Sequence, residues 1–286
     1  MINNNHKLVS KNTNKRGIQK SVIMDRIIDY ENLSNKIQEW ILSYTVENKI
    51  TTLVVGVSGG IDSAVVSTLC AETGLPTLVL NLPLNSSEKN TELSDKHISF
   101  LCSKYDNVHG YTIDLSKTFQ EFKSNVFFEK EFYSELGFAN TKSRLRMMAL
   151  YQIASSRNGI VIGTGNKVED FGVGFYTKYG DGGVDISPIA DLYKTEVRNL
   201  GRHLGVINEI INAEPTDGLW EDNRVDEVQI GATYEELEWA MERGVDKQNY
   251  SEKEYKIIET FLTLNRKNKH KMVSIPIFDL KENEII

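Results

Sequence analysis

The sequence predicts an α/β fold in which a mostly parallel sheet carries helices on both faces. Two observations lead to this prediction. Residues 52–57 form an apolar, β-branched run without the alternation of a half-exposed strand, and helical spacing follows at once. Three more short apolar runs, at 76–82, 109–113 and 159–163, alternate with helical patterns along the chain. Such alternation is typical of a Rossmann-like sheet.

The turn after the first strand, residues 58–63, reads Ser-Gly-Gly-Ile-Asp-Ser. It directs backbone N–H groups and a helix N-terminus, with about half a positive charge, at one point. Gly59 and Gly60 lack a Cβ, so another group can approach the backbone closely. These features favour a bound anion such as phosphate. The turn lacks the lysine of a P-loop and the three spaced glycines of a dinucleotide fingerprint. It resembles the pyrophosphate loop of ATP pyrophosphatases.

Asp62 has two interpretations. A carboxylate beside a triphosphate requires a cation between them, which implies Mg²⁺. An acid in the first helical turn also stabilises its helix by about 0.3–1 kcal/mol, so Asp62 alone fits either role. The serines and glycines around it favour the nucleotide role.

The other elements follow in order. Residues 1–24 form a basic extension without an acid or a hydrophobic period, which we expect to be disordered, and residues 25–286 form one domain. An amphipathic helix is expected from Asp25 onward. Ser86 or Ser87 is expected to cap the helix that ends near Tyr105. Further helices are expected over residues 61–72, 115–128 (with Phe119 and Phe122 facing inward), 140–157, 191–204 and 251–265.

Polar residues gather where strands end. Ser58 and Thr164 each follow a strand, and ligands bind beyond the carboxyl ends of parallel strands. The acids Glu169 and Asp170 come shortly after Thr164. Lys194, in the first turn of its helix, opposes the helix dipole, which makes sense if it faces an anion.

Two further segments are open to more than one interpretation. Residues 177–185 are rich in glycine and carry Lys178 and Asp185 at their ends, which an ordinary surface turn does not explain. The basic run over residues 267–271 is either a solvated charge cluster or part of a binding site.

The composition argues against several classes of function. A net charge of −7 and a pI near 5.4 argue against a general nucleic-acid surface. The apolar runs are too short to span a membrane. The two cysteines, Cys70 and Cys102, have no metal-ligand spacing and are expected to be buried, which fits a reducing cytoplasm.

Four later motifs are more specific than the first loop: residues 175–183, 188–194, 214–216 and 270–271. With residues 58–63 they make the chain, from about residue 30 to 278, resemble the ammonia-dependent NAD synthetases. These enzymes belong to the N-type ATP pyrophosphatases, whose fold is adenine nucleotide alpha hydrolase-like. The resemblance implies a cytoplasmic homodimer that uses ATP and Mg²⁺ to amidate deamido-NAD with ammonia, through an adenylate, giving NAD, AMP and pyrophosphate.

The resemblance also assigns residues. Asp62 and Lys194 are implied as catalytic, and Asp62 and Glu169 as Mg²⁺ ligands; a one-residue difference in spacing leaves Asp170 as an alternative to Glu169. The implied ATP-binding residues are Gly56, Val57, Ser58, Gly59, Gly60, Ile61, Asp62, Ser63, Thr164, Lys194 and Thr216. The implied deamido-NAD-binding residues are Arg144, Lys178, Asp185, His270 and Lys271.

Two rival functions remain at this point. A tRNA-modifying ATP pyrophosphatase shares the first loop, but the basic surface and catalytic cysteines expected of that class are not evident. An ATP-binding sensor domain needs no second substrate site, so residues 178–185 and 270–271 count against it.

Overall fold

The computed structural model describes residues 26–27, 29–84, 88–216, 218–220, 225–243 and 250–280. The predicted extension over residues 1–24 and the predicted caps Ser86 and Ser87 lie outside these residues.

The described part of the chain contains one four-stranded parallel sheet in the order β3-β2-β1-β4. The strands are β1 (Thr52–Gly56), β2 (Thr77–Asn81), β3 (Val108–Thr112) and β4 (Gly159–Val161). Each lies within two residues of its predicted position, and the α/β prediction is confirmed. Because β4 pairs on the other side of β1 from β2, the strand order reverses between β1 and β4.

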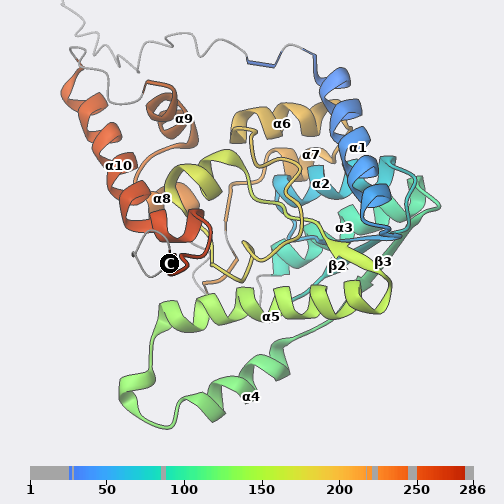
Figure 1. Cartoon of the computed structure of the whole chain (residues 1–286), viewed down its shortest axis with the longest axis horizontal. Helices are drawn as coiled ribbons and strands as arrows, with labels where there is room; N and C mark the ends of the chain where they lie inside the picture. Colours follow the sequence, from blue (N-terminus) through green and yellow to red (C-terminus); the bar gives the residue numbers. More distant parts are fainter. Residues whose placement is uncertain are drawn as a thin grey trace, which may run out of the picture.

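Alternate residues of the strands pack against opposite helical layers. Leu53 and Val55 of β1 face a core shared with α1 (Tyr30–Glu47), α2 (Ile61–Glu72) and α6 (Lys194–His203). Val54 faces a second core shared with α5 (Glu135–Ser156). In Figure 1, α5 runs along one side of the sheet with α4 (Ser116–Val126) beyond it, while α1, α2 and α6 group on the other side.

The remaining helices complete the molecule. They are α3 (Glu88–Lys104), α7 (Asn208–Ile211), α8 (Asp226–Ile230), α9 (Tyr234–Arg243) and α10 (Glu252–Met272), with a 3₁₀ turn at Lys130–Phe132. Lys167–Val173 forms a single π-helix, a rare element that often occurs at functional sites. No described helix has the length and apolar character required to cross a membrane.

Several sequence predictions were wrong in detail. The first helix begins at Tyr30 rather than Asp25, because the Asp29 side chain caps it by accepting from Asn32 N–H. Phe119 is buried as predicted, but Phe122 on the next turn of α4 is 40% exposed. Cys70 is buried, whereas Cys102 is exposed.

Candidate active site

The predicted phosphate loop lies at the point where the strand order reverses. Loops that leave neighbouring strands in opposite directions open a crevice at such a point. The loop after β1 and Thr164 after β4 therefore share this edge of the sheet. Gly56 ends β1, the N–H of Val57 donates to Leu80 O at 2.8 Å, and Ile61 begins α2.

Hydrogen bonds to Ser63 fix the conformation of the loop. Ser58 N–H donates to Ser63 Oγ at 3.1 Å, and Ser63 Oγ donates to Gly60 O at 3.0 Å. Gly59 has a φ of +81°, and a Cβ there would lie 2.6 Å from the carbonyl oxygen of Asn90 in α3. At Gly60 a Cβ would meet only Ser58 Oγ, at an ordinary contact distance of 3.4 Å. The second glycine therefore leaves the outer side of the loop accessible to a ligand.

Thr216 reaches this region from a distant part of the chain. Its Oγ1 accepts a hydrogen bond from Asn90 Nδ2 at 3.2 Å, and the carbonyl oxygen of Asn90 lies against Gly59. The family resemblance assigns Thr216 to the ATP-binding residues, and the structure brings it close to the loop.

The centre of the site is an ammonium group between two carboxylates. Lys194 Nζ lies 2.5 Å from Asp62 Oδ2 and 2.9 Å from Glu169 Oε1. The lysine is 3% exposed at the start of α6, and its side chain reaches α2 and the π-helix. The anion that Lys194 was predicted to face is therefore this pair of carboxylates. Asp62 precedes Lys194 by 132 residues in the sequence, whereas Glu169 precedes it by only 25.

The pKa values of Asp62 and Glu169 are shifted in opposite directions. Burial raises the pKa of Asp62, and the neighbouring charge of Glu169 adds to the rise. Burial alone would also raise the pKa of Glu169, but the Lys194 charge and the hydrogen bonds from Tyr234, Lys194 and Asn166 lower it below its ordinary value. Burial lowers the pKa of Lys194, but the two carboxylates outweigh burial and raise it. Lys194 is therefore a permanent cation, and perturbed groups of this kind cluster at functional sites.

Asp170 occupies a different place from Glu169. A Cβ at Gly165 would lie 2.0 Å from Asp170 Oδ2, so this carboxylate packs directly on the Gly165 backbone. Burial and the nearby charge of Glu169 raise the pKa of Asp170 well above its ordinary value. Asp62 and Glu169 share Lys194, which makes Glu169 the better geometric partner of Asp62. Among the described residues no group of three or more His, Cys, Asp or Glu is arranged to hold a metal, so phosphate oxygens and water would have to complete a Mg²⁺ site at this pair.

Three of the predicted substrate-binding residues lie side by side. Arg144 of α5 approaches the carbonyl oxygen of Lys178 at 3.4 Å, and Lys178 Nζ donates to the carbonyl oxygen of His270 at 3.1 Å. His270 and Lys271 lie in the last turn of α10, which continues seven residues beyond its predicted end. Lys271 Nζ donates to the carbonyl oxygens of Gly174 and Tyr176.

The carboxylate of Asp185 accepts hydrogen bonds from β4 and α5. Its Oδ2 accepts from the N–H of Val161 in β4 at 2.7 Å, and its Oδ1 accepts from Tyr151 Oη at 3.1 Å. These contacts tie the end of the glycine-rich segment to the sheet. The segment itself is held by Asp181, which accepts from Ser143 Oγ at 2.6 Å and from Thr177 N–H at 3.0 Å.

Sequence reasoning missed several residues that support the centre. Asn166 Oδ1 caps the π-helix by accepting from the N–H groups of Val168 and Glu169, and Asn166 Nδ2 approaches Asp62 Oδ1 at 3.4 Å. Tyr234 Oη donates to Glu169 Oε1 at 2.5 Å. An asparagine just before a helix is a recognisable cap, whereas no local pattern signals the contact made by Tyr234.

Comparison with known proteins agrees with this geometry. The sequence profile of the NAD synthase family matches residues 33–274. The chain belongs to the NAD synthase family. The NH₃-dependent NAD⁺ synthetase of Methanosarcina acetivorans is 36% identical over 259 residues, which cover 88% of this chain and all of that protein.

Solved structures agree as well. The NMN synthetase of Francisella tularensis is 31% identical, superimposes with a TM-score of 0.79, and covers 88% of this chain and 100% of its own. The NH₃-dependent NAD synthetase of Campylobacter jejuni is 25% identical with a TM-score of 0.68 and the same coverage of both chains.

Proposed function

We propose that this member of the NAD synthase family is an ammonia-dependent NAD synthetase that amidates deamido-NAD with ATP. The observation that carries the proposal is the Lys194 ammonium between Asp62 and Glu169, beside a phosphate-type loop at the switch point of the sheet. A family match over residues 33–274 supports the same activity.

The chemistry requires activation of an unreactive carboxylate. A nicotinate carboxylate oxygen attacks the α-phosphorus of ATP, the bond to the bridging oxygen breaks, and pyrophosphate leaves. Ammonia then attacks the activated carbonyl carbon, a proton is lost from nitrogen, and AMP leaves with the former carboxylate oxygen. No side chain has to form a covalent bond, so the protein contributes positioning and charge neutralisation.

Each part of the site has a role in this scheme. The loop over residues 58–63 and Thr164 and Thr216 hold the phosphates. Asp62 and Glu169 fit Mg²⁺, since carboxylate oxygens are its preferred protein ligands, and the ion would neutralise phosphate charge. Lys194 then pairs with negative charge that develops on the phosphates.

The deamido-NAD site is assigned to the basic cluster of Arg144, Lys178, His270 and Lys271. The contacts among the first three support a shared site. Asp185 stays a proposed member of this site, although both its carboxylate oxygens accept hydrogen bonds from Val161 and Tyr151.

Three matched substitutions test the metal assignment. Asp62→Asn and Glu169→Gln each remove a charge without changing shape, and each should lower kcat by about 100-fold or more, as removal of electrostatic stabilisation does. Asp170→Asn should leave kcat within about 10-fold of the wild type if Asp170 is not a ligand. Pyrophosphate release with deamido-NAD, ATP and Mg²⁺ is the measurement. Near-normal turnover by a folded Asp62→Asn protein would contradict the proposal.

A second candidate substrate comes from the likeness to the Francisella NMN synthetase. Nicotinate mononucleotide carries the same nicotinate carboxylate, so the same two steps would convert it to the mononucleotide amide. Measuring kcat/KM for deamido-NAD and for nicotinate mononucleotide separates the two. A higher kcat/KM for deamido-NAD is expected here, and the reverse ratio would assign the chain to the second activity.

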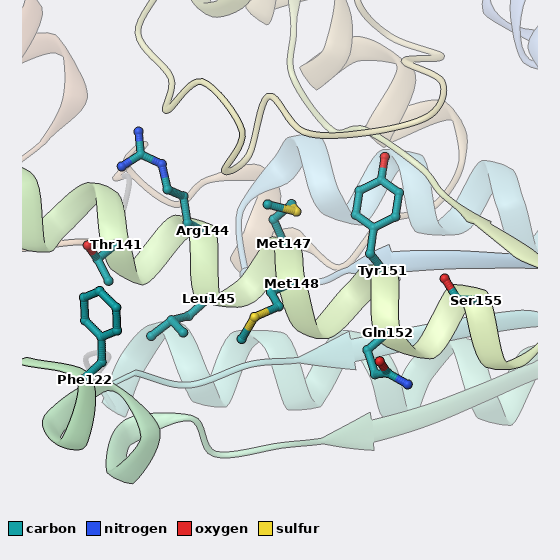
Figure 2. A pocket seen from close by; sticks show the side chains of 9 residues that line it. All are labelled: Phe122, Thr141, Arg144, Leu145, Met147, Met148, Tyr151, Gln152 and Ser155. Atoms are coloured by element: carbon teal, nitrogen blue, oxygen red, sulfur yellow. The ribbon is translucent and has the colours of Figure 1, made fainter. Parts of the chain in front are cut away.

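We also propose that the enzyme is a cytoplasmic homodimer that pairs through the outer face of α5. An open groove of about 630 Å³ lies there, lined by Phe122 of α4 and residues of α5 (Figure 2). Met148 in this groove is 56% exposed. Arg144 lines the groove and also contacts Lys178, which would place the deamido-NAD site beside the interface.

Sedimentation tests the dimer. Met148→Glu puts a charge into the groove and should give a monomer at micromolar concentration. Val46→Glu, at a 76% exposed position near the end of α1, is the matched control and should stay dimeric. A fully active wild-type monomer at the same concentration would contradict the proposal.

A further inference from the structure

One face of α9 carries three polar residues that all reach the candidate active site. Tyr234, Glu238 and Glu242 follow one another at intervals of four residues, so they line a single stripe of the helix. Tyr234 and Glu238 are both fully buried. Glu242 is exposed, so the buried part of this stripe is Tyr234 and Glu238, on a helix that packs against the π-helix and α6.

Glu238, the middle residue of the stripe, accepts hydrogen bonds from Thr195, the residue after Lys194. Glu238 Oε1 accepts from the N–H of Thr195 at 3.0 Å, and Glu238 Oε2 accepts from Thr195 Oγ1 at 2.7 Å. Both bonds fall at the N-terminus of α6, where a carboxylate also interacts favourably with the helix dipole. Glu238 therefore fixes the backbone directly next to Lys194.

The last residue of the stripe holds the residue before Lys194. Glu242 Oε1 accepts from Tyr193 Oη at 2.5 Å. Lys194 is thus flanked on both sides by residues anchored to α9.

Tyr234, the first residue of the stripe, contacts Glu169 and Lys194. Tyr234 Oη donates to Glu169 Oε1 at 2.5 Å, and Lys194 Nζ lies 4.9 Å from the centre of the Tyr234 ring. Tyr234 Oη also lies 3.4 Å from Asp226 Oδ2 in α8. One side chain therefore contacts both the proposed metal ligand and the proposed catalytic cation.

We propose that Tyr234 and Glu238 are positioning residues for the adenylation step: Tyr234 orients Glu169 toward Mg²⁺, and Glu238 orients Lys194 toward the phosphates. This inference rests on the proposed function of the same site. Groups that hydrogen-bond to metal ligands fix the orientation of those ligands, and losing one typically costs about 10- to 100-fold in metal affinity or activity. Neither residue needs to touch substrate.

Tyr234→Phe removes one oxygen atom and tests the first half. Mg²⁺ is titrated calorimetrically into the full chain saturated with a non-hydrolysable α,β-methylene ATP analogue. We expect a Mg²⁺ Kd about 10- to 100-fold higher than in the wild type. Tyr105→Phe is the matched control, because Tyr105 Oη also donates to a glutamate, Glu72 of α2, at 3.0 Å. The control should leave the Mg²⁺ Kd unchanged.

An unchanged Mg²⁺ Kd in folded Tyr234→Phe would overturn the role of Tyr234. This titration does not require amidation of deamido-NAD. If the wild type binds Mg²⁺ and the ATP analogue but forms no NAD from deamido-NAD and ammonia, the proposed function fails while the positioning inference is still decided.

Glu238→Gln and Glu238→Ala test the second half. Glutamine keeps an acceptor for Thr195 N–H and an amide donor for the Thr195 hydroxyl, so kcat should stay within about threefold of the wild type. Alanine removes both contacts, and kcat should fall about 10-fold or more with the KM for deamido-NAD unchanged. Should Glu238→Ala fail to fold, Thr195→Val removes the hydroxyl contact from the other side and should lower kcat in the same way. Equal kcat values for the glutamine variant and the variant that lacks the contact would overturn the inference.

Discussion

At the scale of single residues, Gly59 and Gly60 differ although they are neighbours. Gly59 has a φ of +81° and packs against the α3 backbone, whereas Gly60 has an ordinary φ of −91°. Gly59→Ala should lower the free energy of unfolding by about 3 kcal/mol, from left-handed strain plus steric overlap. Gly60→Ala should cost about 1 kcal/mol or less, as an alanine at a helix N-cap does. Urea denaturation of the two variants is the measurement, and equal losses would contradict the distinction.

The sequence predicted the charged centre but not its support. Asp62 is recognisable because the serines and glycines around it favour a bound phosphate. Lys194 is recognisable because a lysine in the first turn of a helix opposes the helix dipole. Tyr234 and Glu238 form hydrogen bonds with residues that lie 65 and 43 positions away in the sequence. Their identity as partners depends on how α9 docks, and no local spacing encodes that. The same holds for Asp185, whose two hydrogen bonds join it to β4 and α5.

At the scale of elements, the contact between α6 and α9 depends on pH through Glu238. Burial raises the pKa of Glu238 to about 7 in the folded state, against 4.5 as its ordinary value. The carboxylates of Glu235 and Glu196 face it and act in the same direction, while the Thr195 hydrogen bonds oppose the rise. Below pH 4.5 the group is protonated in both states, so its contribution to stability is fully present. As pH rises through about 7, the unfolded state has already released the proton and this contribution is lost.

Glu238→Gln removes this titration while keeping a hydrogen-bonding side chain. The free energy of unfolding of the variant, minus that of the wild type, should therefore increase by about 3 kcal/mol between pH 4.5 and pH 8. Urea denaturation at several pH values across this range measures the difference directly. A difference that does not change with pH would show that Glu238 ionises normally in the folded protein.

Strands were easier to predict from the sequence than helix ends. A strand buried on both faces is a short apolar run bounded by Pro, Gly or polar residues, so its limits are visible. The ends of α5 and α10 lie outside the strongest apolar patterns. Ser134 caps α5 by accepting from Gly137 N–H, so the helix begins at Glu135, five residues before the predicted start. The last turn of α10 is kept by tertiary contacts such as Lys271 with Gly174 and Tyr176, which outweigh a sequence pattern that reads as a solvated charge run.

At the scale of the whole molecule, the site is assembled from segments spread over most of the chain. The predicted phosphate loop follows β1, Glu169 lies in the π-helix after β4, Lys194 begins α6, and His270 lies in the last turn of α10. The sheet fixes the first two at one edge, while α9 packs on the π-helix and α6, and α10 packs on the π-helix and α9. The candidate active site therefore depends on the packing of the second half of the chain onto the first.

The nitrogen source depends on whether the chain carries a nucleophile that can release ammonia from glutamine. Releasing ammonia from glutamine requires an activated nucleophile, most often a thiolate. The chain has two cysteines. Cys70 is a fully buried residue of α2, where burial raises the pKa of its thiol, and Cys102 is an exposed residue of α3 whose sulfur lies close to Gly110 of β3. The buried Cys70 thiol is neither ionised nor presented to a substrate, and Cys102 is not among the residues of the candidate active site.

The purified chain should therefore form NAD from deamido-NAD, ATP, Mg²⁺ and ammonium chloride, and none above background from ammonia-free glutamine. A Cys70→Ala/Cys102→Ala double variant should keep the ammonia-dependent rate, because neither sulfur takes part in the two steps. Chromatographic measurement of NAD with each nitrogen source decides the point. Comparable NAD formation from glutamine by the wild type would contradict the prediction, and its survival in the double variant would show that a nucleophile other than a thiol releases the ammonia.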